Sequence, residues 1–366
     1  MGYDIPLKTN PCDFLLDIAT PDQRSSELKQ QSFDRISLFK NAWQQYSSLL
    51  GKPTHRDIGY AILPKPPRFT VTRFFKEIGT LMSRNLKEMF RDPEVILAYF
   101  GQAVIIVLIM GFLFWQLDLT REGIQDRLGV LFFISTNLAY GIVFPNVVVF
   151  AQQRALIKRE RAGCTYRSYT SYLARIGTSL PMVTMVALII ALPVYWMIGL
   201  QRVTSKYLNF ILIVLVQSHT ANAIGLMIGS MVPTVNMGQI VAPLFLMIML
   251  LFGGQLINLN RMTFALRWLQ YLSIIGYTNK ALAQNEFSGL SFPCPPAISN
   301  GTSTAAANAT QVARCTESGE HILSTVALDN FGFWDCILVN AGFMFGFYIL
   351  GYIAYHYTTA PLRKLK

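Results

Sequence analysis

Long apolar blocks that are nearly free of charge recur along the chain from position 95 onward. Each holds about twenty residues, enough for an α-helix to cross a hydrocarbon core of about 30 Å. The pattern predicts six membrane-spanning helices, at Val95–Trp115, Leu128–Phe150, Ile176–Leu200, Leu208–Met231, Gly238–Ile257 and Phe333–Tyr357. The sequence therefore predicts an all-α membrane protein with its membrane domain at 93–357.

A different hydrophobic pattern precedes the first span. From Phe69 to Arg91, apolar residues recur at helical spacing with basic residues between them. A basic amphipathic helix is typical of the inner membrane interface, whereas the alternative is an ordinary surface helix on a soluble domain. Because Asp92-Pro93 leads straight into the first apolar block, we favour an interfacial helix at 68–92.

The segment 1–67 is polar and mixed in charge, and it ends in the sequence PKPP. This composition is typical of a linker rather than of an independent domain. No cleavable signal peptide is recognisable after Met1, so the first span is expected to act as the targeting signal. A short tail at 358–366 follows the last span.

Composition and charge placement refine this picture. The chain is 52% hydrophobic and 14% charged, which is typical of membrane proteins. Its net charge of +11 does not indicate nucleic-acid binding, because the basic residues are not gathered with aromatic residues on one face. Most lie before the first span, between Arg154 and Arg175, or after Pro361. By the positive-inside rule, both termini are expected in the cytosol.

The segment Asn258–Asn330 is then expected on the outer side. It contains Cys294 and Cys315, with glycosylation sequons at Asn300 and Asn308 between them. Disulfides and N-linked sugars both belong to non-cytosolic compartments, although sequons also arise by chance. We expect a Cys294–Cys315 disulfide and glycosylation at both asparagines.

Within the spans, His219 is the ionisable residue that lies deepest. A lone histidine near Gln217 and Asn222 favours a hydrogen bond between helices over a proton relay. On the same span, Ala221, Gly225 and Gly229 follow at four-residue intervals. Small residues at this spacing predict a close helix crossing.

The most charged segment between spans is Gln152–Arg167, on the predicted cytosolic side. It is a candidate contact for a cytosolic partner, although its arginines taken singly could simply satisfy the positive-inside bias. That bias does not explain Glu160, which lies beside Arg159 and Arg161.

Several stretches of the chain resemble one transporter family. The opening MGYDIPLKTNPCDFLLDI resembles the segment that closes the nucleotide-binding domain in the G (White) subfamily of ATP-binding-cassette transporters. The later stretches resemble the type-2 transmembrane domain of that subfamily: RNLKEMFRDP, GVLFFISTNLAYG, IKRERAGCTYRSYTSYLAR, GGQLINL and RWLQYLSIIGYTNKALAQNEF. The resemblance covers essentially the whole chain and implies an ABC-2 type, type V exporter-like fold in which 68–92 is the connecting helix.

The resemblance also implies residue roles. Arg159, Glu160 and Arg161 correspond to the first coupling loop, which transmits ATP-driven closure of the motor domains to the spans. The implied substrate cavity, between paired subunits, is lined by Thr136, Asn137, Tyr140, Pro243, Met247 and Leu250. For Met247 and Leu250 the alternative is packing against neighbouring helices. The gate falls on Gln255 and Leu256, and a glutamine there implies a wetter gate than the family's apolar one. No metal site is expected.

The chain shows no GxxxxGK[ST] loop, so it is not expected to be an ATPase by itself; ATP and Mg belong to the nucleotide-binding domain. The leading hypothesis is the membrane half of an ATP-driven exporter of lipids, sterols or amphipathic organic molecules. It would work by alternating access as a homo- or heterodimer with another G-subfamily subunit, in the plasma membrane. The alternative is a motorless subunit that regulates full-length transporters. A truncated or split gene is favoured over a genuinely motorless subunit, and a channel is disfavoured because the spans lack rings of charge.

Overall fold

The computed structural model describes residues 18–21, 26–49, 70–163, 165–254, 264–293, 316–328 and 331–359. The chain divides into two units, Met1–Lys65 and Pro66–Lys366. The first unit contains α2 (Ser26–Leu49), whose side chains are mostly exposed. The polar composition of this region predicted a linker and not a helix. The helix is continuous because the segment holds neither glycine nor proline.

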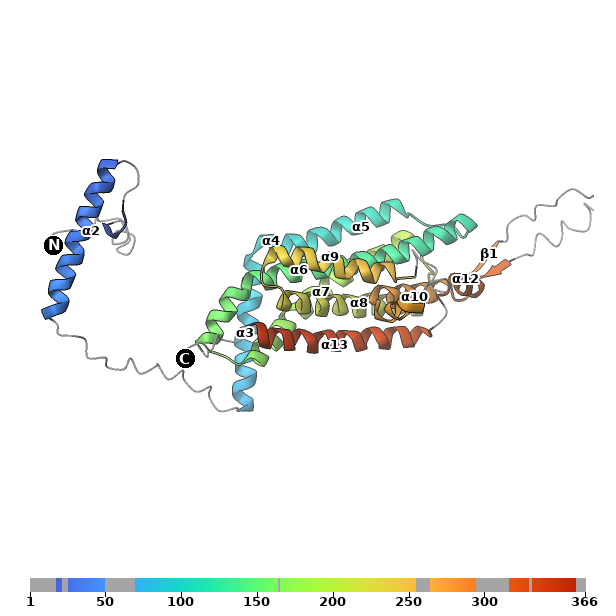
Figure 1. The fold of residues 1–366 in the computed structure, drawn as a ribbon. Helices are drawn as coiled ribbons and strands as arrows, with labels where there is room; N and C mark the ends of the chain where they lie inside the picture. The colour runs from blue at the N-terminus through green and yellow to red at the C-terminus, as the bar shows by residue number, and fades with distance from the viewer. Residues whose placement is uncertain are drawn as a thin grey trace, which may run out of the picture. The chain divides into compact units, whose positions relative to one another are not determined.

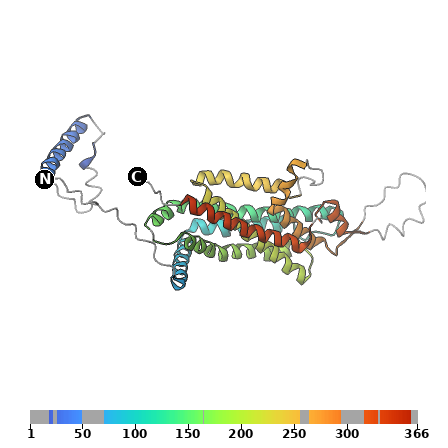
Figure 2. The same cartoon turned by 60° about the horizontal axis from the view of Figure 1, so that its bottom comes forward.

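In the second unit, α3 (Val71–Arg91) lies across one end of a bundle of longer helices (Figures 1 and 2). The bundle is built from α5 (Gln102–Leu113), α6 (Arg121–Ala162), α7 (Ser168–Ile198), α8 (Thr204–Met231), α9 (Val235–Leu251), α10 (Ile274–Phe287) and α13 (Phe333–Thr358). Helices α6, α7, α8 and α13 are each long and apolar enough to cross a membrane. Two shorter apolar helices cover Tyr99–Leu113 and Val235–Leu251. The chain is therefore an integral membrane protein.

Asp92 and Pro93 separate α3 from the first apolar segment. Asp92 has an extended backbone, and its carboxylate accepts a hydrogen bond of 3.0 Å from the backbone nitrogen of Glu94. Proline at the first helical position and an aspartate cap both favour a new helix start. The segment then continues as α4 (Pro93–Ile96), a π-helical turn η1 (Leu97–Gly101) and α5. The first predicted span is thus interrupted by a π-helical turn.

The second predicted span is much longer than the sequence analysis indicated. Helix α6 does not end near Phe150 but runs to Ala162, so most of the charged segment Gln152–Arg167 extends this helix. The charged segment had been placed between the spans, whereas most of it continues the second span as helix. Polar residues do not terminate a helix by themselves, and the end falls at Gly163.

Helices α6 and α8 cross at close range. A Cβ atom added to Gly225 would lie 2.7 Å from the Asn146 Cβ atom, and one added to Gly229 would lie 2.9 Å from the Phe150 Cβ atom. These distances leave no room for a side chain. The prediction of a close crossing at these glycines is confirmed.

The segment Asn258–Asn330, predicted as an outer loop, contains helices and strands among its described residues. The 3-10 helix η3 (Phe264–Leu272) leads into α10, which is buried against α6, α8 and α13. Strands β1 (Ser291–Pro293) and β2 (Thr316–Ser318) pair antiparallel, and α12 (Gly319–Thr325) follows. Figure 1 places the strands at the end of the bundle opposite α3. The buried helix α10 was not predicted from the sequence pattern.

Polar side chains hold α10 inside the bundle. The Thr278 hydroxyl donates to the Gln217 Oε1 atom at 2.6 Å, and the Asn340 amide donates to the same oxygen at 3.1 Å. These residues belong to α10, α8 and α13 and are buried. Buried polar groups remain favourable only when they are paired, so this network fixes how the three helices pack.

Candidate functional site

Glu160 joins two elements at the α3 end of the bundle. Its Oε1 atom lies 2.8 Å from the Arg84 Nη1 atom of α3, and its Oε2 atom accepts a hydrogen bond of 2.7 Å from the Tyr166 hydroxyl. Burial lowers the pKa of Arg84, but the hydrogen bond and the charge of Glu160 outweigh this effect, and the net shift is upward. Burial, together with the hydrogen bond to Glu160, raises the pKa of Tyr166. Tyr166 therefore stays a hydrogen-bond donor at neutral pH.

The two arginines beside Glu160 have different environments. Arg161 donates to the Thr359 hydroxyl and, at 3.2 Å, to the His356 carbonyl, so it ties the end of α6 to the end of α13. Its guanidinium carbon also lies 5.9 Å from the ring centroid of Tyr355. Arg159 is exposed. Of the predicted coupling residues, two therefore bind other parts of this unit and one faces outward.

Arg154 is a functional candidate that the sequence analysis missed. It is buried, and it donates a hydrogen bond to the Val232 carbonyl at the C-terminal end of α8. This bond links α6 to the turn that leads into α9. Helical spacing could have indicated it, since Arg154 follows the buried Phe150 by four positions.

The predicted cavity residues lie on α6 and α9, which pack against each other. The Thr136 hydroxyl is buried and has no hydrogen-bond partner among the described residues. The Asn137 amide donates to the Phe133 carbonyl at 2.9 Å, and the Tyr140 ring stacks on Phe144 with centroids 5.9 Å apart. On α9, the structure places Pro243 and Leu250 half-buried and Met247 exposed.

The remaining predicted site residues lie outside the described residues. These are the gate residues Gln255 and Leu256, the cysteines Cys294 and Cys315, and the sequon asparagines Asn300 and Asn308. Deep in the fourth predicted span, the His219 Nε2 atom lies 3.2 Å from the Thr184 Oγ1 atom of α7. The expected hydrogen bond between helices is confirmed.

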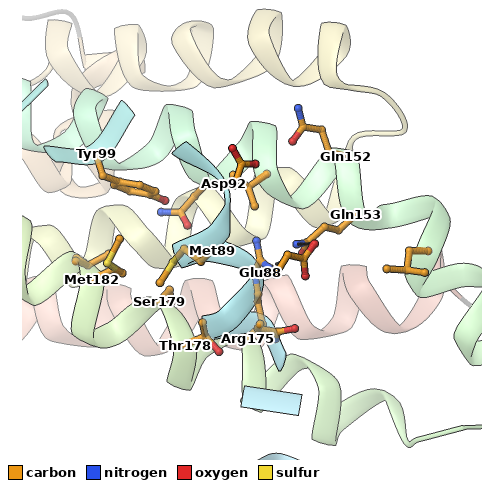
Figure 3. A pocket seen from close by; sticks show the side chains of 15 residues that line it. Glu88, Met89, Asp92, Tyr99, Gln152, Gln153, Arg175, Thr178, Ser179 and Met182 are labelled. Atoms are coloured by element: carbon orange, nitrogen blue, oxygen red, sulfur yellow. Dashed lines mark hydrogen bonds between the residues drawn. The ribbon is translucent and has the colours of Figure 1, made fainter. Parts of the chain in front are cut away.

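A cavity of about 250 Å³ lies beneath the C-terminal end of α3 (Figure 3). We call it the inner pocket, and it is bounded by the last turns of α3, Tyr99 of η1, residues 146–156 of α6 and residues 175–183 of α7. The Gln153 amide donates to the Glu88 carboxylate at 2.9 Å and accepts a hydrogen bond from Arg175. This pocket could not be predicted from the sequence, because its lining comes from four elements that are distant in sequence.

The family model described as ABC-2 type transporter matches residues 76–287. This match covers more than half of the chain. The apolar helices and the match together define the membrane domain of a transporter, and the chain belongs to this family.

Curated relatives narrow the assignment to the G subfamily. The chain is 29% identical over 297 residues to ABC transporter G family member 7 of Arabidopsis thaliana, covering 80% of this chain and 41% of that protein. It is 26% identical over 375 residues to the broad substrate specificity ATP-binding cassette transporter ABCG2 of Mus musculus, covering 96% and 56%. ABC transporter G family member 1 of Dictyostelium discoideum is 28% identical over 291 residues, covering 76% and 35%. The chain thus spans between about a third and just over half of each relative.

Proposed function

We propose that the chain is the membrane half of an ATP-driven exporter that moves lipids, sterols or amphipathic organic molecules by alternating access. ATP and Mg would be bound by a nucleotide-binding domain joined to it, not by the described helices. The observation that carries this proposal is the contact between Arg84 and Glu160, since it connects α3 to the charged end of α6.

Helix α6 provides a direct mechanical path for such a mechanism. Glu160 and the predicted cavity residue Tyr140 lie on the same continuous helix, twenty positions apart. At about 1.5 Å per residue, this separation corresponds to roughly 30 Å along the axis. A displacement of the charged end by a cytosolic motor would therefore be transmitted to the cavity face along this helix, past Pro145, which lies between the two positions.

The exposed surface of α9 supports assembly with a second subunit. Met237, Ile240, Leu244 and Met247 are exposed, and the polar Gln239 is exposed among them. An uncharged amide facing lipid lacks hydrogen-bond partners, whereas a partner subunit or a wet cavity supplies them. We propose a homodimer or a heterodimer with another G-subfamily subunit, placed in the plasma membrane with six spans and both termini in the cytosol.

The test is transport in vesicles bearing the chain fused to the nucleotide-binding domain of a G-family relative, screened over sterols, phospholipids and planar drugs. Glu160→Ala should lower substrate-stimulated ATP turnover while surface expression stays unchanged. The matched control is Lys158→Ala, which removes an exposed charge from the same turn region. Equal turnover in both variants and the parent fusion would remove the coupling role from Glu160. A fusion that transports nothing but suppresses a co-expressed relative would instead identify a regulatory subunit.

A further inference from the structure

We propose that Gln153 is a positioning residue that transmits movements of α3 to α7 during transport. Its side chain lies between Glu88 of α3 and Arg175 of α7 and forms a hydrogen bond with each (Figure 3). We call these three residues the inner link. The inference rests on the proposed function, and it adds a path through α7 to the path along α6 that begins at Glu160.

The inner link is a continuous chain of hydrogen bonds across three helices. The Gln153 Nε2 atom donates to the Glu88 Oε1 atom at 2.9 Å, and the Arg175 Nη1 atom donates to the Gln153 Oε1 atom. An amide has donors at one end and an acceptor at the other, so a carboxylate on one side and a guanidinium on the other select this orientation. Both hydrogen bonds involve a charged group and are therefore stronger than bonds between neutral groups.

The inner link lies one helical turn before a break in the chain. Helix α3 ends at Arg91, and Asp92 has an extended backbone before α4 begins. A few residues between two helices are enough to let one helix rotate against the other. Glu88 lies four positions before Asp92. A rotation of α3 about this break therefore moves the Glu88 carboxylate and pulls on the Gln153 amide.

The apolar contacts between α3 and α7 allow such a rotation. The rings of Phe74 and Tyr169 have centroids 5.9 Å apart, and a Cβ atom added to Gly177 would lie 3.3 Å from the Met82 sulfur. Hydrophobic contacts have no preferred direction, and methionine adapts to irregular surroundings. A hydrogen bond weakens steeply when its angle changes. The inner link is therefore the contact that makes α7 follow α3.

Arg175 extends the path into the core of the bundle. Its guanidinium carbon lies 6.0 Å from the ring centroid of Phe150 on α6. Phe150 is buried and packs edge-to-face on Tyr355 of α13, with ring centroids 5.9 Å apart. A cation over an aromatic ring is attracted to it, so Arg175 is held on this side as well. A movement of Gln153 thus reaches side chains of α6, α7 and α13.

Two nearly isosteric substitutions should break and restore the inner link. Gln153→Glu replaces the Nε2 donor by a carboxylate oxygen, which repels Glu88 and still accepts from Arg175. The contact with α3 is then lost while the contact between α6 and α7 remains. Adding Glu88→Gln supplies a donor on α3 and restores the hydrogen bond with its two groups exchanged. The matched control is Gln152→Glu, which adds the same charge at the neighbouring exposed position.

The existence of the link is tested on the chain alone in detergent, where no motor is needed. Gln153→Glu should lower the thermal midpoint, and the double variant with Glu88→Gln should recover it. Gln152→Glu should unfold at the midpoint of the parent chain. A double variant that is no more stable than Gln153→Glu would show that Glu88 and Gln153 are not partners, and it would overturn the inference.

The transmitting role is tested on the chain fused to the nucleotide-binding domain of a G-family relative. Gln153→Glu should lower the stimulation of ATP turnover by substrate roughly threefold, as expected for a partly exposed charged contact, and leave basal turnover unchanged. The double variant should restore the stimulation, and Gln152→Glu should not change it.

Two failures of this second experiment can be told apart. Parent-like stimulation in Gln153→Glu, together with a lowered midpoint, would reduce the link to a packing contact and overturn the inference. A parent fusion whose ATP turnover no substrate stimulates would overturn the proposed function, and the transmitting role with it. The midpoints of the chain alone do not depend on the motor, so they report on the link in either case.

Discussion

Arg127 of α6 and Glu286 of α10 form a buried ion pair, with the Arg127 Nη1 atom 2.5 Å from the Glu286 Oε1 atom. Their side chains are only 3% and 2% exposed. Arg127 also donates to the Leu117 carbonyl at 2.6 Å, and the Gln201 backbone nitrogen donates to Glu286 at 3.1 Å. The pair therefore ties α6, α10 and the turn between α7 and α8 together at one site.

Removing one partner of this pair should destabilise the bundle strongly. Arg127→Ala would leave a carboxylate buried without its counter-ion, which costs about 3–5 kcal/mol of unfolding free energy. The exposed Arg202 provides the control, and Arg202→Ala should change stability by less than about 0.5 kcal/mol. Thermal unfolding in detergent measures both variants, and equal midpoints for the two would contradict the structural role of the pair.

The same variant should acquire a pH dependence. Burial raises the pKa of Glu286, whereas the Gln201 N–H and Arg127 oppose this shift. Without Arg127 the folded-state pKa rises further above the unfolded value. The folded state then binds the proton more tightly, so stability is greatest at low pH and falls as the pH rises through the folded pKa. The deficit of Arg127→Ala should thus be larger at pH 8 than at pH 5, and a deficit independent of pH would count against a buried charge.

Arg154 offers a separate test at the other end of the bundle. Its guanidinium donates to the Val232 carbonyl, which ends α8. Arg154→Ala would leave this carbonyl without the donor and should cost about 1–3 kcal/mol, whereas Arg154→Lys should recover part of the loss because lysine also donates. The measurement is the unfolding of both variants and of the parent chain in detergent. Equal stability of the alanine variant and the parent chain would show that the hydrogen bond does not hold the turn.

Residues that act through local spacing were predictable, and residues that act through distant partners were not. The spacing of Gly225 and Gly229 predicted the close crossing of α6 and α8, because small residues four positions apart lie on one helix face. Arg127 and Glu286 are separated by 159 positions, and no local sequence pattern around either residue indicates that the two form an ion pair. Helix α10 lies within the segment Asn258–Asn330, which was predicted as an outer loop from its place between two spans, and its burial depends on contacts that only the folded bundle supplies.

The candidate site likewise contains residues that the local sequence indicated and residues whose contacts depend on distant partners. The mixed charge of the segment 152–167 drew attention to Glu160, yet its partner Arg84 lies on a helix 76 positions earlier. Tyr99 attracted no attention because a tyrosine at the start of an apolar span is an ordinary interfacial residue. Its place in the lining of the pocket becomes visible only once α6 and α7 enclose it.

The strand pair gives a prediction for the outer cysteines. Strands β1 and β2 pair in the register Ser291 with Ser318 and Pro293 with Thr316. Cys294 follows Pro293 and Cys315 precedes Thr316 in the sequence, and both cysteines lie outside the described residues. Facing residues of an antiparallel pair have Cα atoms about 4.5–5.5 Å apart, within the range that a disulfide requires.

We therefore expect peptide mapping without reductant to find a Cys294–Cys315 bridge. Closing a loop of about twenty residues should stabilise the chain by about 3 kcal/mol, so Cys294→Ser and Cys315→Ser should lower the unfolding midpoint equally. The double variant should be no worse than either single one. Additive losses in the double variant would indicate two independent cysteines instead of a bridge.

Tyr140 tests the proposed cavity between subunits. Its ring stacks on Phe144 on a half-buried part of α6, and its apolar surface suits flat ligands. In the motor-fused form, Tyr140→Ala should change ligand affinity or preference, by about tenfold for a planar aromatic substrate, because a stacked ring contributes about 0.5–1.5 kcal/mol beyond its buried area. The matched control is Tyr357→Ala, which removes a tyrosine that is 75% exposed on α13. Transport assays over sterols, phospholipids and planar drugs compare the two variants. If both transport the whole panel as the parent fusion does, Tyr140 does not line the cavity, and the substrate path must follow another face of α6.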